Sequence, residues 1–97
     1  MMNPDKVCRE RLGTLTDLPN VGPKIAALLV RLGIDQPRDL VGRDGFELYN
    51  AICCCDGIRY DPCLLDVFIS ITRFMNNESP RPWWEYTAER KRLYPDL

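Results

Sequence analysis

The chain has 97 residues, which is enough for one hydrophobic core and too few for two, so we expect a single domain over residues 1–97. Its 13 basic and 14 acidic side chains give a formal net charge of −1, whereas nucleic-acid-binding modules usually carry a basic excess. Any DNA contact must therefore come from a local patch. The sequence contains no histidine, which removes the commonest general base and the Ser/His and Cys/His nucleophile pairs, so we expect no enzymatic activity and no catalytic residue.

The cysteines indicate reduced thiols rather than a metal centre. They are Cys8, the run Cys53–Cys55 and Cys63, an odd number that fits neither a disulfide framework nor paired C-x2-C zinc ligands. Consecutive helical residues point about 100° apart, so the run cannot converge on one ion, and we expect no metal and no cofactor. The carboxylates of Asp61 and Asp66 disfavour a thiolate at Cys63, which we expect to be a buried structural thiol.

The sequence carries no sign of membrane insertion or export. No apolar run approaches the roughly 18 residues that span a bilayer, and the charged N-terminus lacks the apolar core of a signal peptide. We therefore expect a cytoplasmic protein with no membrane partner.

Apolar positions recur at helical spacing along most of the chain, and regular strand alternation is hard to find. Asn3 and Pro4 form a cap and first-turn pair, which predicts a helix that runs towards Arg11 or beyond. A short second helix, residues 15–18, leads into a turn at residues 19–22. The whole pattern predicts an all-α domain, compact and built of five or six short helices.

The next helix is predicted from Pro23 to about Leu32, and Gly33 is placed to end it in a left-handed conformation. Its apolar residues occupy two faces of the helical wheel, so we expect it to be sandwiched between other elements. Lys24 and Arg31 are seven residues apart and project at nearly the same angle, which gives a candidate basic stripe beside the turn.

Further helices are predicted at residues 35–41, 44–56, 61–75 and 83–94, with a flexible connection at residues 76–82. The second of these should turn Cys55 inward and stop at Gly57. The third is the predicted central helix, because its apolar residues cover all of its circumference except a narrow polar strip of Asp66, Ser70 and Arg73.

The turn at residues 19–22 carries the chemistry that this sequence offers. Gly22 has no Cβ, so another molecule can approach the backbone there, and Asn20 is the best non-glycine occupant of a left-handed position. The turn should aim main-chain N–H groups outward at the positive end of the following helix. Such a helix end is a site for an anion.

The stretch LPNVGPKIAALLVRLGI resembles the helix-hairpin-helix motif of DNA repair and recombination proteins, here at about residues 14–33. That motif is commonly apolar-x-Gly-apolar-Gly-x-x-x-Ala, and this sequence has Asn20 in place of the first glycine. The resemblance implies that N–H groups around Val21, Gly22 and Lys24 contact the DNA backbone and that the Lys24 side chain assists them.

Some members of the helix-hairpin-helix family also hold a monovalent cation on hairpin carbonyls. The resemblance maps that cation to the carbonyls of Thr16, Leu18 and Val21. No other metal site is implied.

A wider resemblance covers most of the chain and rests on LPNVGPKIAALLVRLGI, RDGFELYNAIC, YDPCLLDVFISITRFM and PWWEY. These segments resemble the small bacterial helix-hairpin-helix proteins of the pathogenicity-locus or mitomycin-resistance type. The first half is also similar to the C-terminal domain of Tfo-type competence regulators. The resemblance implies a SAM-like helix-hairpin-helix architecture and supports fold better than activity.

The aromatic and basic segment at residues 80–97 has two interpretations. In the first, Trp83, Trp84 and Tyr86 stack on unpaired bases of a nucleic acid. In the second, which is the more common case for tryptophans that follow a proline-rich connection, they fold back over the core. The run at residues 90–92, with Arg81, favours a solvated helix face over a phosphate track.

We expect a non-catalytic module that binds the DNA backbone and reads no base sequence, because phosphate contacts position a protein without specifying a site. The candidate phosphate-binding residues are Asn20, Val21, Gly22, Lys24 and Arg31, with Arg38 or Arg43 extending the patch. The alternative is a helical adaptor that binds another protein and not DNA, since degenerate hairpins often pack against proteins and the net charge is acidic. Strand preference and oligomeric state are not indicated.

Overall fold

The computed structural model describes residues 3–97, and within them it contains helices and no strand. The α-helices are α1 (Pro23–Arg31), α2 (Gly45–Asp56), α3 (Pro62–Met75) and α4 (Thr87–Leu93). Three 3-10 turns precede α1: η1 (Pro4–Lys6), η2 (Arg9–Arg11) and η3 (Leu15–Asp17). Of the others, η4 (Pro37–Leu40) lies between α1 and α2, and η5 (Trp83–Tyr86) lies between α3 and α4. The all-α class is confirmed. The expected count of five or six helices is not, because residues 3–97 form four α-helices and the rest of the helical structure is 3-10 turns.

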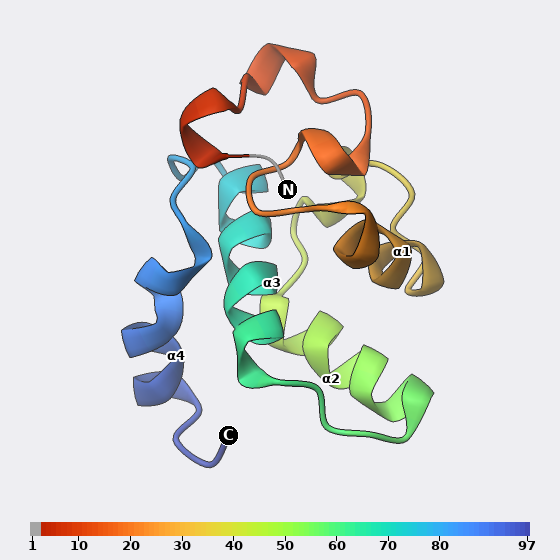
Figure 1. Ribbon diagram of the computed structural model, residues 1–97, viewed down its shortest axis with the longest axis vertical. Helices are drawn as coiled ribbons and strands as arrows, with labels where there is room; N and C mark the ends of the chain where they lie inside the picture. Colours follow the sequence, from red (N-terminus) through yellow and green to blue (C-terminus); the bar gives the residue numbers. More distant parts are fainter. Residues whose placement is uncertain (1–2) are drawn as a thin grey trace.

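Helix α3 is the centre of the structure, as predicted. Figure 1 shows it between α4 on one side and α2 and α1 on the other, with the N-terminal turns, drawn in red, crossing one end of it. Ten of its 14 residues are buried. Asp61 caps its first turn by accepting a hydrogen bond from the Cys63 N–H at 2.8 Å, and Pro62 fits the first position because it has no N–H to satisfy.

Helix α2 packs closely on α3 because Gly45 has no side chain. A Cβ at Gly45 would lie 2.8 Å from the backbone nitrogen of Ile69. The helix begins at its predicted cap, where Asp44 accepts from the Glu47 N–H at 3.2 Å, and it ends at Gly57, whose φ of 66° lies in the left-handed region. Both predicted boundaries are therefore confirmed.

The predicted helix from Pro4 to Arg11 does not form as one element. Val7 and Cys8 are extended, and they separate the turns η1 and η2. The Arg9 guanidinium donates to the carbonyls of Phe74 at 2.8 Å and Glu78 at 3.0 Å, and it lies over the Phe74 ring. These long-range contacts explain the break, because they fix the direction of the chain more strongly than local helix propensity does.

Helix α1 is buried on one side only, so the expectation of a sandwiched helix was wrong. Leu29 is fully buried, but Val30 is 52% exposed and Ala27 is also exposed. Helix α1 therefore leaves Ala27 and Val30 to solvent, whereas Ala26 between them and the core is half-buried. The inward turn of Cys55 was wrong as well: Cys55 is exposed, and Cys53 is the half-buried cysteine of α2.

Two residues of the polar strip of α3, Asp66 and Ser70, lie inside the protein, whereas Arg73 is half-buried. Asp66 is fully buried and accepts hydrogen bonds from Arg90 Nε at 2.9 Å and from Thr87 Oγ1 at 2.7 Å. Arg90 is only 5% exposed, so its expected place on a solvated helix face was wrong, whereas Lys91 and Arg92 are exposed. A buried carboxylate requires such partners, and the pair fixes α4 against α3.

None of the helices that the structure describes is long and apolar enough to cross a membrane.

Candidate functional site

Asn20 adopts the left-handed conformation predicted for it, with φ of 66°. Its side chain, however, is turned into the protein: the residue is 2% exposed, and Nδ2 donates to Ser70 Oγ at 3.1 Å and to the Arg81 carbonyl at 2.9 Å. The Asn20 amide is therefore engaged inside the protein. It ties the turn to α3 and to the segment that enters η5.

The rest of the turn places the start of α1 at the surface. Leu18, Pro19 and Val21 are buried, so the Val21 side chain anchors the turn in the core and has no surface for a phosphate. Gly22 is the half-buried N-cap of α1, with an ordinary extended φ of −102° and no side-chain cap. Lys24 follows it and is exposed.

The first turn of α1 has free hydrogen-bond donors. Over residues 3–97, the N–H groups of Gly22, Lys24 and Ile25 donate no hydrogen bond, and the first main-chain bond is from Ala26 to Gly22 at 3.0 Å. Pro23 has no N–H. A helix N-terminus carries roughly half a positive charge, so these donors and the Lys24 ammonium together form a small electropositive site.

Arg31 does not extend that site, because its guanidinium pairs with Asp56 at the end of α2, with one N–O distance of 3.0 Å. Asp56 also accepts a hydrogen bond from the Tyr60 hydroxyl. These two contacts, led by Arg31, lower the pKa of the Asp56 carboxyl below its usual range. Arg31 therefore connects α1 to α2 and to Tyr60.

The other predicted basic residues are not gathered at the turn by any contact. Arg43, just before α2, pairs with Glu47 in the first turn of that helix, with an N–O distance of 2.8 Å. Arg38 is exposed beside the Gln36 side chain. The cation predicted on the carbonyls of Thr16, Leu18 and Val21 stays a prediction. In the described part of the chain, the carbonyls of Leu18 and Val21 accept no hydrogen bond, so their oxygens fit that ligand type.

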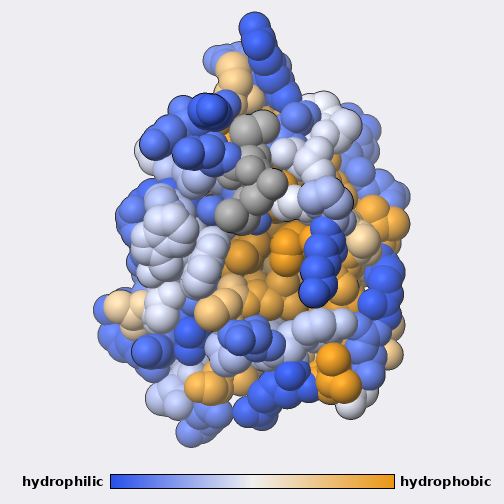
Figure 2. Space-filling model, in the orientation of Figure 1, coloured by the Kyte–Doolittle hydropathy of each residue, from blue (hydrophilic) through white to orange (hydrophobic). Residues whose placement is uncertain are grey.

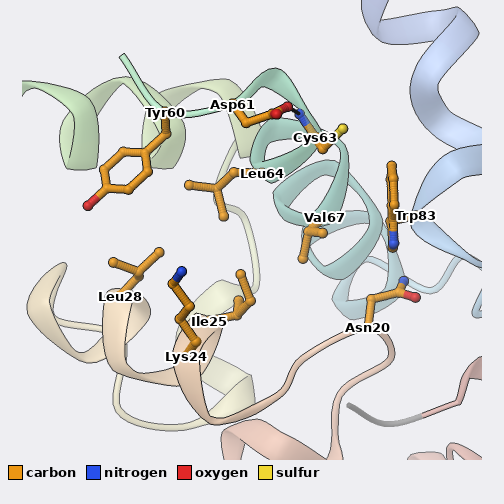
Figure 3. Close-up of a pocket in the computed structure, with 10 residues that line it drawn as sticks. All are labelled: Asn20, Lys24, Ile25, Leu28, Tyr60, Asp61, Cys63, Leu64, Val67 and Trp83. Atoms are coloured by element: carbon orange, nitrogen blue, oxygen red, sulfur yellow. Dashed lines mark hydrogen bonds between the residues drawn. The ribbon is translucent and has the colours of Figure 1, made fainter. Parts of the chain in front are cut away.

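A groove with a volume of about 320 Å³ runs between α1 and the first turns of α3. Its lining residues, drawn in Figure 3, are Asn20, Lys24, Ile25, Leu28, Tyr60, Asp61, Cys63, Leu64, Val67 and Trp83. Helix α1 supplies one wall and α3 the other, and Tyr60 and Trp83 lie at opposite ends. Figure 2, which has the orientation of Figure 1, shows a hollowed apolar area at the place where Figure 1 draws the space between α3 and α1.

Polar contacts fix both ends of the groove. At one end the Tyr60 hydroxyl donates to Asp56, its carbonyl accepts from the Tyr49 hydroxyl, and its N–H donates to Cys53 Sγ at 3.4 Å. At the other end, Asn20 holds the Arg81 carbonyl, two residues before Trp83. The groove is thus formed by the fold itself.

Lys24 and Asp61 are the charged residues of the groove. Figure 3 shows the Lys24 ammonium pointing into the space from α1, whereas Asp61 lies across from it at the start of α3. Among the described residues Lys24 makes no ion pair. Burial, followed by the contact with Asp61, raises the pKa of the Cys63 thiol and keeps it uncharged at neutral pH, but Cys63 is half-buried and not buried as predicted.

The groove was missed in the sequence because its residues come from segments far apart in the chain. One signal in the sequence was that the helix from Pro23 has apolar residues on two faces, which is more than a helix buried on one side needs. Trp83 follows the prediction that the tryptophans fold back, since it is half-buried beside the groove, whereas Trp84 is 59% exposed and meets Trp83 edge to face.

Comparison with known proteins gives the chain its family. The Cdd1 family, described as "Pathogenicity locus", matches residues 8–92. The chain belongs to the Cdd1 pathogenicity-locus family. It is also similar to the mitomycin resistance protein McrB of Streptomyces lavendulae, with 46% identity over 79 residues, 81% of this chain and 75% of that protein. No solved structure matches the chain.

The family match confirms the resemblance to bacterial pathogenicity-locus and mitomycin-resistance proteins. The likeness to Tfo-type competence regulators and to the helix-hairpin-helix motif remains a prediction.

Proposed function

We propose that this protein binds DNA through the phosphate backbone, without reading bases and without catalysing a reaction. In this proposal η3, the turn and α1 act as a helix-hairpin-helix, and the protein works in the bacterial cytoplasm, where DNA is accessible. The observation that carries the proposal is the first turn of α1, where Pro23 and Lys24 are exposed and the N–H groups of Gly22, Lys24 and Ile25 make no hydrogen bond to the described residues.

The chemistry of that turn suits a phosphate diester. A phosphate oxygen accepts hydrogen bonds from consecutive N–H groups at a helix N-terminus, and the helix dipole favours its charge. Gly22 has no side chain to keep the phosphate away, and its extended backbone places no strain on the turn. These donors face the backbone of any sequence, so the proposed binding carries no base preference.

The proposed affinity is low, because the site is small. In residues 3–97, Arg31, Arg43, Arg73, Arg81 and Arg90 are paired with carboxylates, whereas Lys24, in the first turn of α1, makes no ion pair. Non-specific binding of this kind has a Kd of about 10⁻⁴ to 10⁻⁶ M near physiological salt, and it weakens as salt rises because counterions are released.

The test is fluorescence anisotropy with labelled double- and single-stranded DNA at two salt concentrations. Lys24→Glu should weaken binding about tenfold or more and reduce the salt slope by about 1. Lys91→Glu makes the same charge change on the exposed surface of α4 and should leave binding within about twofold. Equal losses in the two variants, or no binding by the wild type at low salt, would contradict the proposal.

The adaptor remains a second candidate because apolar side chains are exposed outside the core. Val30 on α1 and Trp84 in η5 are 52% and 59% exposed, and tryptophan is enriched among the residues that carry the binding energy of protein interfaces. This candidate predicts that Lys24→Glu leaves biological function intact, while Val30→Lys or Trp84→Glu abolishes it.

A further inference from the structure

We propose that the groove between α1 and α3 binds a small amphipathic anion, meaning an apolar or aromatic body that carries one negatively charged group. This proposal uses the side chains that line the groove, whereas the proposed DNA contacts use the N–H groups at the start of α1; Lys24 and Ile25 contribute to both. The size, fixed shape and charge of the groove support this site.

The size and lining of the groove match a ligand site. Pockets for small molecules have volumes of roughly 300–1,000 Å³ and are lined by apolar and aromatic side chains with a few polar groups. The groove measures about 320 Å³ and has Ile25, Leu28, Leu64 and Val67 on its two walls. It therefore suits a molecule of about two fused or linked rings rather than a protein segment.

The shape of the groove is fixed before any ligand arrives. Tyr60 at one end is held by Tyr49, Cys53 and Asp56, and the chain before Trp83 at the other end is held by Asn20. A preformed pocket loses less conformational entropy on binding than a flexible one, so even a small ligand gains from burying its apolar body there.

The charge of the groove selects an anion. The Lys24 ammonium points into the space and has no carboxylate partner in the described residues. The Asp61 carboxylate lies on the opposite wall, where it already accepts the Cys63 N–H at the positive end of α3. We therefore place the anionic group of the ligand at Lys24 and its apolar body over Leu64 and Val67.

A pair of fluorescent probes separates the apolar and ionic contributions. The first is 8-anilinonaphthalene-1-sulfonate, and the second is N-phenyl-1-naphthylamine, which has the same ring system without the sulfonate. The wild-type protein should bind both saturably at one site. Lys24→Gln should weaken the sulfonate probe about tenfold, because a hydrogen bond to a charged group is lost, and should leave the uncharged probe within about twofold.

A second hollow in the protein provides the matched control. It has a volume of about 400 Å³, is more polar, and has Arg59 on its lining. Arg59→Gln removes an exposed cation there and should change neither probe. Leu28→Trp fills the groove with a larger side chain from the half-buried rim and should abolish both probes, while DNA binding by the turn is retained.

Each variant is first checked for cooperative unfolding by circular dichroism, because the sulfonate probe also binds partly folded chains. If Leu28→Trp fails this check, Val67→Phe fills the same groove from the α3 wall. No saturable binding of either probe to the wild type would overturn the proposal. Equal effects of Lys24→Gln on the two probes, or an effect of Arg59→Gln that matches it, would overturn it as well.

Discussion

The Asn20 side chain provides the sharpest test of how this turn is built. Replacing Asn20 by glycine restores the residue usual in helix-hairpin-helix turns and keeps the left-handed backbone without strain. It removes the two hydrogen bonds from Nδ2 to Ser70 and Arg81. Each bond contributes about 0.5–1.5 kcal/mol net, and the greater freedom of glycine in the unfolded chain adds about 0.4–1 kcal/mol. The expected loss of unfolding free energy is thus about 1.5–4 kcal/mol.

Asn20→Asp is the matched comparison. Aspartate also tolerates the left-handed region and has almost the same shape, but its carboxylate has no N–H to donate and would face the Arg81 carbonyl in a buried position. This variant should therefore be less stable than Asn20→Gly. Urea unfolding followed by far-UV circular dichroism measures both values.

Two outcomes would refute this account of Asn20. One is an Asn20→Asp variant as stable as the wild type, which would place the amide in solvent. The other is an Asn20→Gly variant that loses DNA affinity after correction for its folded fraction, since the proposed phosphate contacts use the backbone and not the amide.

Three further perturbations test the packing of the fold by the same unfolding measurement. Asp66→Leu or Arg90→Met alone should cost about 3–5 kcal/mol, because each leaves a buried charge without its partner, whereas the double variant should cost less than either; an additive double variant would contradict this. Asp56→Asn should be less stable than the wild type near pH 7. The folded pKa of Asp56 is lowered, so its contribution is present above the unfolded pKa of about 3.9 and is lost as the pH falls through the folded value; a gap that persists at about pH 2 would argue against the ion pair. Gly45→Ala should cost about 1–3 kcal/mol because its Cβ would meet the backbone of Ile69 at 2.8 Å, and an unchanged midpoint would show that α2 shifts freely on α3.

The sequence predicted most helix boundaries correctly because they are set by local chemistry. The caps Asp44 and Asp61 and the left-handed residues Gly33 and Gly57 lie where the pattern placed them. Such signals depend on a few neighbouring residues, and those neighbours are visible in the sequence.

The failures have a different origin, because they depend on contacts between distant residues. The N-terminal helix is broken where Arg9 reaches Phe74 and Glu78, 65 and 69 residues away. Arg31 was predicted to face DNA and instead pairs with Asp56, 25 residues away. A helical wheel gives the angle at which a side chain leaves its helix, but it does not show which segment covers that face.

The candidate site was predictable only in part for the same reason. The turn, its left-handed Asn20 and the exposed Lys24 follow from local sequence. The inward direction of the Asn20 amide and the groove beside Lys24 depend on α3 and on the segment before Trp83.

The most direct test of the central claim is a nuclear magnetic resonance titration of the ¹⁵N-labelled protein with a short DNA duplex at low salt. The account predicts that the largest amide shifts occur at Gly22, Lys24 and Ile25, where the N–H groups have no acceptor in the described chain. The same shifts should appear with duplexes of unrelated sequence. Shifts confined to α4 and its exposed Lys91 and Arg92, or no shifts at all, would contradict it.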